Sequence, residues 1–151
     1  MRSAFNISSG VALAASGLAK VVSVFGGSEA LHLPDPIIGI KFSTLMLAVG
    51  IAETVIAMVC FLSKAQTLAL ELVAWLATSV LIYRVGLWWI GWKKPCTCLG
   101  NLTDALHIPP QVADNIMKAV LGYLLIGSYA LLIMKLRNQR FADLSRATAK
   151  A

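Results

Sequence analysis

The sequence predicts an all-α fold, a four-helix transmembrane bundle in a single domain, and three observations point to it. The chain has 151 residues, of which 58% are hydrophobic. Only 13% are charged, about half the share of an average soluble domain. The mean hydropathy is +0.78. A soluble core of this size cannot hide so much apolar surface, so lipid is the expected solvent.

Four apolar segments are each close to the roughly 20 residues that a helix needs to cross a bilayer. They cover residues 5–25, 42–62, 67–90 and 116–134. Lipid offers no partner for a free backbone amide, so such segments must be helical. The tight turn "SKAQ" separates the second from the third. Pro109 or Pro110 suits the first turn of the fourth, and the polar tail is expected to be helical near the membrane and frayed beyond.

The distribution of basic residues predicts the orientation. Four spans put both termini on one side, where seven basic residues gather: Arg2, Lys64, Lys135, Arg137, Arg140, Arg146 and Lys150. The opposite side has four: Lys41, Lys93, Lys94 and Lys118. Basic residues favour the cytoplasmic side, so the termini are expected there. The loop between the third and fourth spans then faces the periplasm of a bacterial inner-membrane protein.

That loop carries the candidate chemistry, in the stretch "KKPCTCLGNLTDALHIPP". Cys96 and Cys98 are one residue apart, and a disulfide between them would close a small, strained ring. Strained disulfides are more oxidising and tend to be labile or catalytic. Lys93 and Lys94 favour the reactive thiolate, and His107 can donate or accept a proton. Cys96, Cys98 and His107 are therefore the candidate catalytic residues.

Other interpretations of the cysteine pair stay open. A vestigial or purely structural pair is one, although so small a loop gains little entropy from being closed. A soft Cu(I) site made of the two thiolates is another. A closed zinc site needs two more ligands, for which only His107 and His32 are available, so no metal site is assigned. Cys60, inside the second span, is expected to be an inert core residue.

A family resemblance follows from "YRVGLWWIGWKKPCTCLGNLTDAL", together with "SGLAK" in the first span and "LPDPIIGI" before Glu53. These stretches resemble the MauE/DoxX-like redox-associated membrane proteins. That family pairs a Tyr-Arg near the outer end of its third helix with a Cys-x-Cys-Leu/Phe-Gly motif. The similarity covers about residues 8 to 134.

The resemblance implies a four-helix membrane protein tied to thiol redox chemistry. MauE is associated with methylamine utilisation, where a disulfide-rich dehydrogenase subunit must mature. The fold is also similar to the DsbB and vitamin K epoxide reductase bundles, which pass electrons from thiols to quinone. Those proteins carry a CxxC pair and a second pair, whereas this sequence has CxC and no second extracytoplasmic pair.

Aromatic residues gather at the outer end of the third span. Trp88, Trp89 and Trp92 lie beside Tyr83 and Arg84, as in an interfacial aromatic belt. The alternative is a quinone site under the cysteine loop, for which Tyr83, Arg84 and Trp88 are the candidate cofactor-binding residues.

Three charged residues lie inside the spans: Lys20, Glu53 and Arg84. An unpaired charge in lipid costs about 2.5 to 3.5 kcal/mol, so Glu53 is expected to pair with Lys20 or Arg84. Gly50 and Ala57 share its helical face and let neighbours approach closely. The pair is either structural or part of a proton relay or quinone contact.

The sequence therefore predicts an integral membrane thiol–disulfide redox protein that supports disulfide formation or electron transfer, with quinone as the candidate acceptor. A non-catalytic subunit that braces a larger membrane complex is the alternative, and copper handling is a third. Expected partners are lipid and a periplasmic thioredoxin-like or client protein. The net charge of +6 is explained by basic residues at membrane edges and needs no nucleic acid.

Overall fold

The computed structural model describes residues 2–25, 34–63, 66–91 and 109–148. Their regular structure is helical apart from one short bridge between Pro34 and Lys41. The helices are α1 (Arg2–Val24), α2 (Phe42–Leu62), α3 (Gln66–Trp89) and α5 (Pro110–Thr148). Each contains a stretch that is long and apolar enough to cross a membrane. The all-α, four-helix prediction is confirmed.

The helix ends follow local signals in the sequence. The amide of Gly91 donates to the carbonyl of Trp88 at 3.0 Å, just after α3. Gly91 has a φ of 71°, in the left-handed region where glycine commonly terminates helices. In the next described segment, α5 begins at Pro110. The amide of a first helical residue has no acceptor within the helix, so the missing amide proton of proline costs nothing there.

The fourth helix is longer than the apolar span within it. The span was expected at 116–134, but α5 has 39 residues and ends at Thr148. At about 1.5 Å per residue it is about 58 Å long, nearly twice the ~30 Å hydrocarbon core of a bilayer. Polar residues end a membrane span without ending a helix, so α5 continues past the predicted span into the polar tail, which was expected to be helical near the membrane and frayed beyond.

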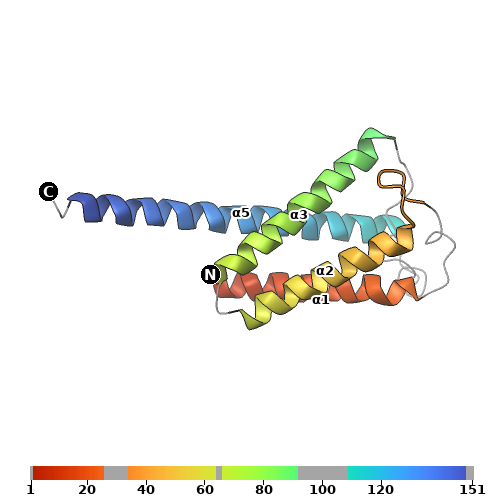
Figure 1. Ribbon diagram of the computed structural model, residues 1–151, viewed down its shortest axis with the longest axis horizontal. Helices are drawn as coiled ribbons and strands as arrows, with labels where there is room; N and C mark the ends of the chain where they lie inside the picture. The colour runs from red at the N-terminus through yellow and green to blue at the C-terminus, as the bar shows by residue number, and fades with distance from the viewer. Residues whose placement is uncertain (1, 26–33, 64–65, 92–108, 149–151) are drawn as a thin grey trace.

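The helices associate as two pairs, α1 with α2 and α3 with α5 (Figure 1). The beginning of α1 and the end of α5 lie toward the same end of the molecule, which we call the terminus end. At the opposite end, the loop end, α1 stops, α2 begins, α3 stops and α5 begins. Toward the loop end, α3 diverges from the α1–α2 pair.

The α1–α2 contact is close enough for the two backbones to touch. A Cβ placed on Gly17 would lie 2.8 Å from the carbonyl oxygen of Gly50. A Cβ on Gly50 would lie 3.0 Å from the carbonyl oxygen of Gly17. Small residues allow this approach, which supplies van der Waals packing where lipid removes the hydrophobic driving force between helices.

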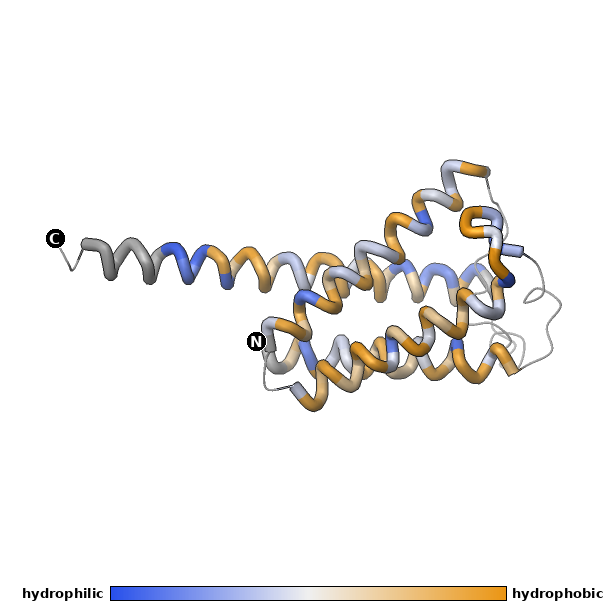
Figure 2. The backbone as a smooth tube through the Cα atoms, viewed as in Figure 1, coloured by the Kyte–Doolittle hydropathy of each residue, from blue (hydrophilic) through white to orange (hydrophobic). Residues whose placement is uncertain are grey.

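Buried apolar side chains fill the bundle mainly toward the terminus end. The largest cluster of them joins all four helices and consists of Leu13, Ile56, Ala57, Cys60, Ala69, Val73, Leu76, Ala77 and Leu124. A second, smaller cluster of Phe5, Leu70 and Leu131 lies beside it. Hydrophobic residues are frequent along all four helices (Figure 2), and many of the large ones are exposed, as expected for contact with lipid.

Candidate functional site

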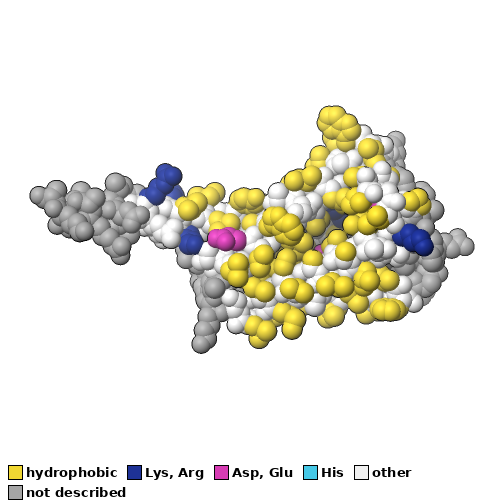
Figure 3. Space-filling model, in the orientation of Figure 1, with side chains coloured by type: hydrophobic (Ala, Val, Ile, Leu, Met, Phe, Trp, Pro, Cys, Tyr) yellow, Lys and Arg dark blue, Asp and Glu magenta, His cyan; other side chains and the backbone are white. Residues whose placement is uncertain are grey.

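A cavity of about 390 Å³ lies between the two helix pairs, on the loop-end side of the core. All four helices contribute to its walls, which are mostly apolar; six of the apolar wall residues are Leu13, Met46, Leu76, Val80, Met117 and Leu121. The space-filling view is hollowed between α3 and the α1–α2 pair, with charged atoms visible at depth among hydrophobic ones (Figure 3). The divergence of α3 thus opens the bundle where the core ends.

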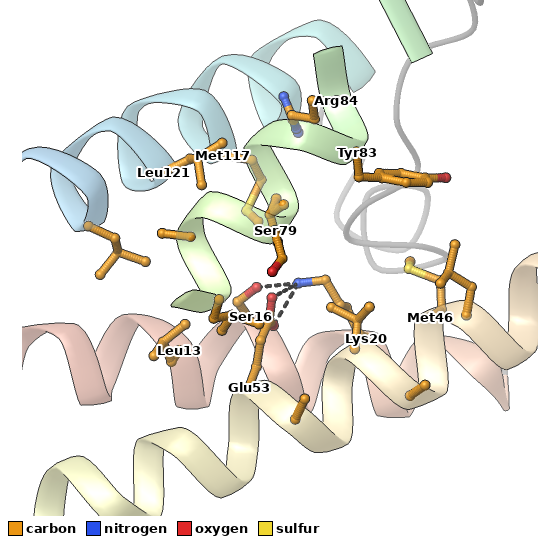
Figure 4. A pocket seen from close by; sticks show the side chains of 18 of the residues that line it. Leu13, Ser16, Lys20, Met46, Glu53, Ser79, Tyr83, Arg84, Met117 and Leu121 are labelled. Carbon is orange, nitrogen blue, oxygen red and sulfur yellow. Dashed lines mark hydrogen bonds and ion pairs between the residues drawn. The ribbon is translucent and has the colours of Figure 1, made fainter. Parts of the chain in front are cut away.

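A buried ion pair lies at the base of the cavity (Figure 4). Lys20 Nζ donates to Glu53 Oε1 at 2.8 Å and to Oε2 at 2.7 Å, and to Ser16 Oγ at 2.5 Å. Both charged residues are only 5% exposed. The expected pairing of Glu53 with Lys20 is confirmed.

The positions of the pair follow from the helix geometry. Ser16 and Lys20 are four residues apart on α1, so their side chains lie on one face. On α2, Gly50, Glu53 and Ala57 are all buried and form the face that meets α1. The contact of Gly17 with Gly50 brings the backbones close just where the ammonium must reach the carboxylate.

Arg84 pairs with Asp114 and not with Glu53, the partner that its position inside the third span suggested. Its guanidinium donates to Asp114 Oδ1 at 3.1 Å, and Lys118 Nζ lies 2.6 Å from Asp114 Oδ2. The pairing joins α3 to α5, and Arg84 also contributes to the cavity wall. Glu53 is satisfied by Lys20, so the alternative pairing of Glu53 with Arg84 does not form.

Tyr83, at the loop end of the cavity, is fixed by a turn that precedes α2. Its hydroxyl donates to Asp35 Oδ2, while Asp35 Oδ1 accepts the amides of Ile37 at 2.9 Å and Ile38 at 2.8 Å. Burial opposes ionisation of Asp35, which is 2% exposed. The hydrogen bonds from Tyr83 and the two amides outweigh that penalty and hold the pKa of Asp35 below its usual value.

The remaining predicted residues do not join this site within the described part of the chain. Trp88 is 80% exposed and is not part of the cavity wall, which fits the aromatic-belt interpretation. Cys96, Cys98 and His107 lie outside the described residues. Cys60 is buried in the core, as expected for an inert residue. Among the described residues, no group of three or more His, Cys, Asp or Glu side chains could hold a metal ion.

Several contributors to the site were not expected from the sequence: Ser16, Asp35, Trp75 and Asp114. Some signals were present. Ser16 precedes Lys20 by one helical turn, and Asp35 stands between two prolines, where a turn-forming side chain is common. The indole of Trp75 lines the cavity from an apolar helix, and no local pattern distinguishes it from a lipid-facing residue.

In chemical terms, the site is an apolar chamber with a neutral ion pair at its base and hydroxyl groups around it. It suits a lipid-soluble molecule with a small polar head. Comparisons of the chain with protein-family models, with curated proteins and with solved structures find no match.

Proposed function

We propose that this protein is an integral membrane thiol–disulfide redox protein, similar to the MauE/DoxX-like group, that uses Cys96 and Cys98. The observation that carries the proposal is the position of the cavity. It lies on the loop-end side of the core, its wall includes Arg84 on α3, and Cys96 follows Arg84 by 12 residues in the sequence. The proposed redox segment thus follows, in the sequence, the helix that forms part of the wall of a chamber that suits a lipid-soluble electron acceptor.

The proposed reaction has two balanced steps. A partner dithiol reduces the Cys96–Cys98 disulfide, so the partner gains a disulfide and the pair becomes two thiols. The two thiols then give two electrons and two protons to a quinone, which becomes a quinol, and the disulfide forms again. The strain of the small ring favours the first step, because strained disulfides have higher potentials.

The cavity supports quinone as the acceptor. Its volume of about 390 Å³ lies within the range of small-molecule pockets. Its wall includes side chains at the outer surface of the helices, among them Trp75, which is 65% exposed, so a molecule dissolved in lipid has a route inward. Tyr83 and Arg84 contribute polar groups to the wall on its loop-end side.

The proposed location is the bacterial inner membrane, with the cysteine pair in the periplasm. The seven basic residues on the terminus side, against four on the loop side, support this orientation. An extracytoplasmic space is also where disulfides form and persist, so the reaction would have oxidisable and oxidising partners at hand.

The test is a redox titration of the purified chain by alkylation and mass spectrometry. A Cys60→Ala background removes the buried third thiol, so that only Cys96 and Cys98 report. We expect a reversible couple with a higher potential than ordinary structural disulfides, and loss of thiol oxidation in a Cys96→Ser/Cys98→Ser variant. A low potential together with full function of that variant would remove the proposal.

A second candidate function, a subunit that braces a membrane complex, is favoured by one feature of α5. This helix extends far beyond the other three, and only 17% of its apolar window is buried. A photo-crosslinking residue at Ile133, which is 55% exposed on α5, would test it, with Val55 on α2 as the matched position. Stoichiometric crosslinks to one protein from Ile133 alone would favour the bracing function.

A further inference from the structure

The charged groups at the base of the cavity have unused hydrogen-bond acceptors but no unused donors. An ammonium group has three protons, and those of Lys20 have three acceptors: Ser16 Oγ and the two oxygens of Glu53. The hydroxyl of Ser79, also in the wall, donates to the carbonyl of Trp75 at 2.9 Å. The carboxylate of Glu53 has accepted one hydrogen bond on each oxygen and keeps further lone pairs.

We infer that the cavity binds a neutral, lipid-soluble molecule with a hydroxyl head, and that this hydroxyl donates a hydrogen bond to Glu53. The charges of Lys20 and Glu53 cancel, so an ionic head at the base of the cavity would have no counter-charge there and would be buried at a high cost. A carbonyl or ether head can only accept a hydrogen bond, for which the hydroxyl of Ser16 is available, and it leaves the carboxylate of Glu53 without an added donor. A hydroxyl head can donate to Glu53 and also accept from the hydroxyl of Ser16.

The shape of the site agrees with such a ligand. Figure 4 shows Ser16 and Glu53 directed from the α1–α2 pair toward Ser79 on α3, with apolar side chains on both sides. Ala48 and Trp75 are exposed members of the wall, so a hydrocarbon tail can extend through that side into lipid. The head therefore lies at the ion pair and the tail at the membrane.

This inference deepens the proposed function. Only the identity of the molecule that carries the hydroxyl group rests on that function. In that reaction the carrier is the quinol, the reduced product. Tighter binding of the reduced form makes the bound quinone a stronger oxidant, and a tenfold preference raises the two-electron potential by about 30 mV. The ion pair would thus favour electron flow from the thiols to the bound quinone.

The experiment uses two redox-silent probes that differ only in the donor, 4-decylphenol and its methyl ether. Saturable binding is measured with the full chain in lipid nanodiscs, after subtraction of uptake by empty nanodiscs. We expect the phenol to bind at least about tenfold more tightly than the ether, as for a hydrogen bond to a charged group. Equal affinities, or no saturable binding of either probe, would overturn the inference.

Three variants test whether the preference for the phenol over the ether arises in the cavity. In Lys20→Met/Glu53→Leu, which removes both charges together, the phenol should lose its advantage while the ether binds as before. Ala48→Phe, which fills the wall from its exposed edge, should weaken both probes, whereas Ala130→Phe on the outer face of α5 should weaken neither. A preference that persists without the ion pair contradicts the assignment, and the comparison of probes on the unmodified chain stands even if the double variant fails to fold.

The Cys96→Ser/Cys98→Ser variant separates this inference from the proposed function. The cavity is built from other residues, so the variant should keep the preference for the phenol. If the cysteine pair cycles but the preference is absent, the inference fails alone. If the preference is present but the cysteine variant retains full thiol oxidation, the proposed function fails and the binding site remains.

Discussion

At the level of single residues, the Lys20–Glu53 pair shows how a buried charge is tolerated in this bundle. Each ion loses its hydration, and the loss is offset only because the ammonium places all three protons on oxygen acceptors. Neither group has a second charged partner among those that the structure describes. Removing one member therefore leaves the other unpaired at 5% exposure, whereas removing both leaves an apolar contact.

We expect Glu53→Leu and Lys20→Met each to destabilise the protein by about 3 to 5 kcal/mol, the usual cost of stranding a buried charge. The double variant should recover most of that loss. Thermal unfolding in a mild detergent measures the cycle, with Glu71→Gln, an exposed acid on α3, as the control. Additive losses in the double variant would show that the two groups do not depend on each other.

The bond from Tyr83 to Asp35 gives a dependence on pH. The pKa of Asp35 is lowered in the folded protein, so its stabilisation is fully present above the ordinary value of 3.8 and is lost as the pH falls through the folded pKa. Tyr83→Phe should cost about 1.5 to 3 kcal/mol near neutral pH, because the acceptor is charged, and less once the pH has fallen through the folded pKa of Asp35. Unfolding measured from neutral pH down through the protonation of Asp35 tests this.

The matched control for Tyr83 is Tyr129→Phe. The hydroxyl of Tyr129 forms a hydrogen bond of 2.9 Å with Thr78 Oγ1, and this neutral pair contains no acid that titrates in the range. Its loss should cost the same amount at every pH in that range. A Tyr83→Phe penalty that stays equally flat even after Asp35 has been protonated would show that Asp35 is not the ionised acceptor.

At the level of elements, glycines decide how closely α1 and α2 approach. A methyl group on Gly17 would lie 2.7 Å from Thr54 Oγ1 and 2.8 Å from the backbone of Gly50, and a backbone cannot move aside as a flexible side chain can. By contrast, a Cβ on Gly122 in α5 meets nothing within 4 Å among the described atoms. The same substitution should therefore have opposite effects at the two positions.

We expect Gly17→Ala to lower the unfolding midpoint, because it pushes α1 away from α2 and lengthens the bonds of the ion pair. Gly122→Ala should leave the midpoint unchanged or raise it, since alanine is favoured over glycine inside a helix by about 0.5 to 1 kcal/mol. Thermal unfolding of the two variants side by side tests the prediction. A stable Gly17→Ala protein would mean that the contact is not as close as described.

The agreement between the predicted spans and the observed helices differs from helix to helix. The second span was predicted at 42–62 and α2 runs over Phe42–Leu62, because hydropathy and a short turn mark both of its ends. The fourth span was predicted at 116–134, and α5 extends beyond it at both ends, because helicity continues into polar sequence. Lys20 and Glu53 could be paired in advance, since lipid penalises every unpaired charge, but the bond between Asp35 and Tyr83 joins residues 48 apart and depends on a folded turn.

At the level of the whole molecule, the cavity results from the angle between two helix pairs. No short stretch of sequence encodes that angle, which is why the cavity could not be predicted even though Lys20, Glu53, Tyr83 and Arg84 were all identified as candidates. The core holds the pairs together on the side of the termini, and α3 leaves the α1–α2 pair on the other side. The bundle is therefore closed at one end and open at the other.

The orientation of the whole molecule can be tested through the same cysteines. A membrane-impermeant thiol reagent, added to intact cells after mild reduction, should label Cys96 and Cys98, because their loop is expected outside. Cys60 is buried at 6% exposure and serves as the internal negative control. Labelling that requires permeabilised cells would reverse the orientation and place the cysteine pair in the cytoplasm.

The close contact of Gly17 with Gly50 has a consequence for how the protein is made. When α1 leaves the ribosome and enters lipid, Lys20 has no counter-ion until Glu53 has been synthesised, 33 residues later. Each helix alone bears the insertion penalty of its charge, about 2.5 to 3.5 kcal/mol, and the two together do not. The first two helices are thus expected to leave the insertion machinery as one hairpin, already in contact at Gly17 and Gly50, before α3 is inserted and completes the bundle.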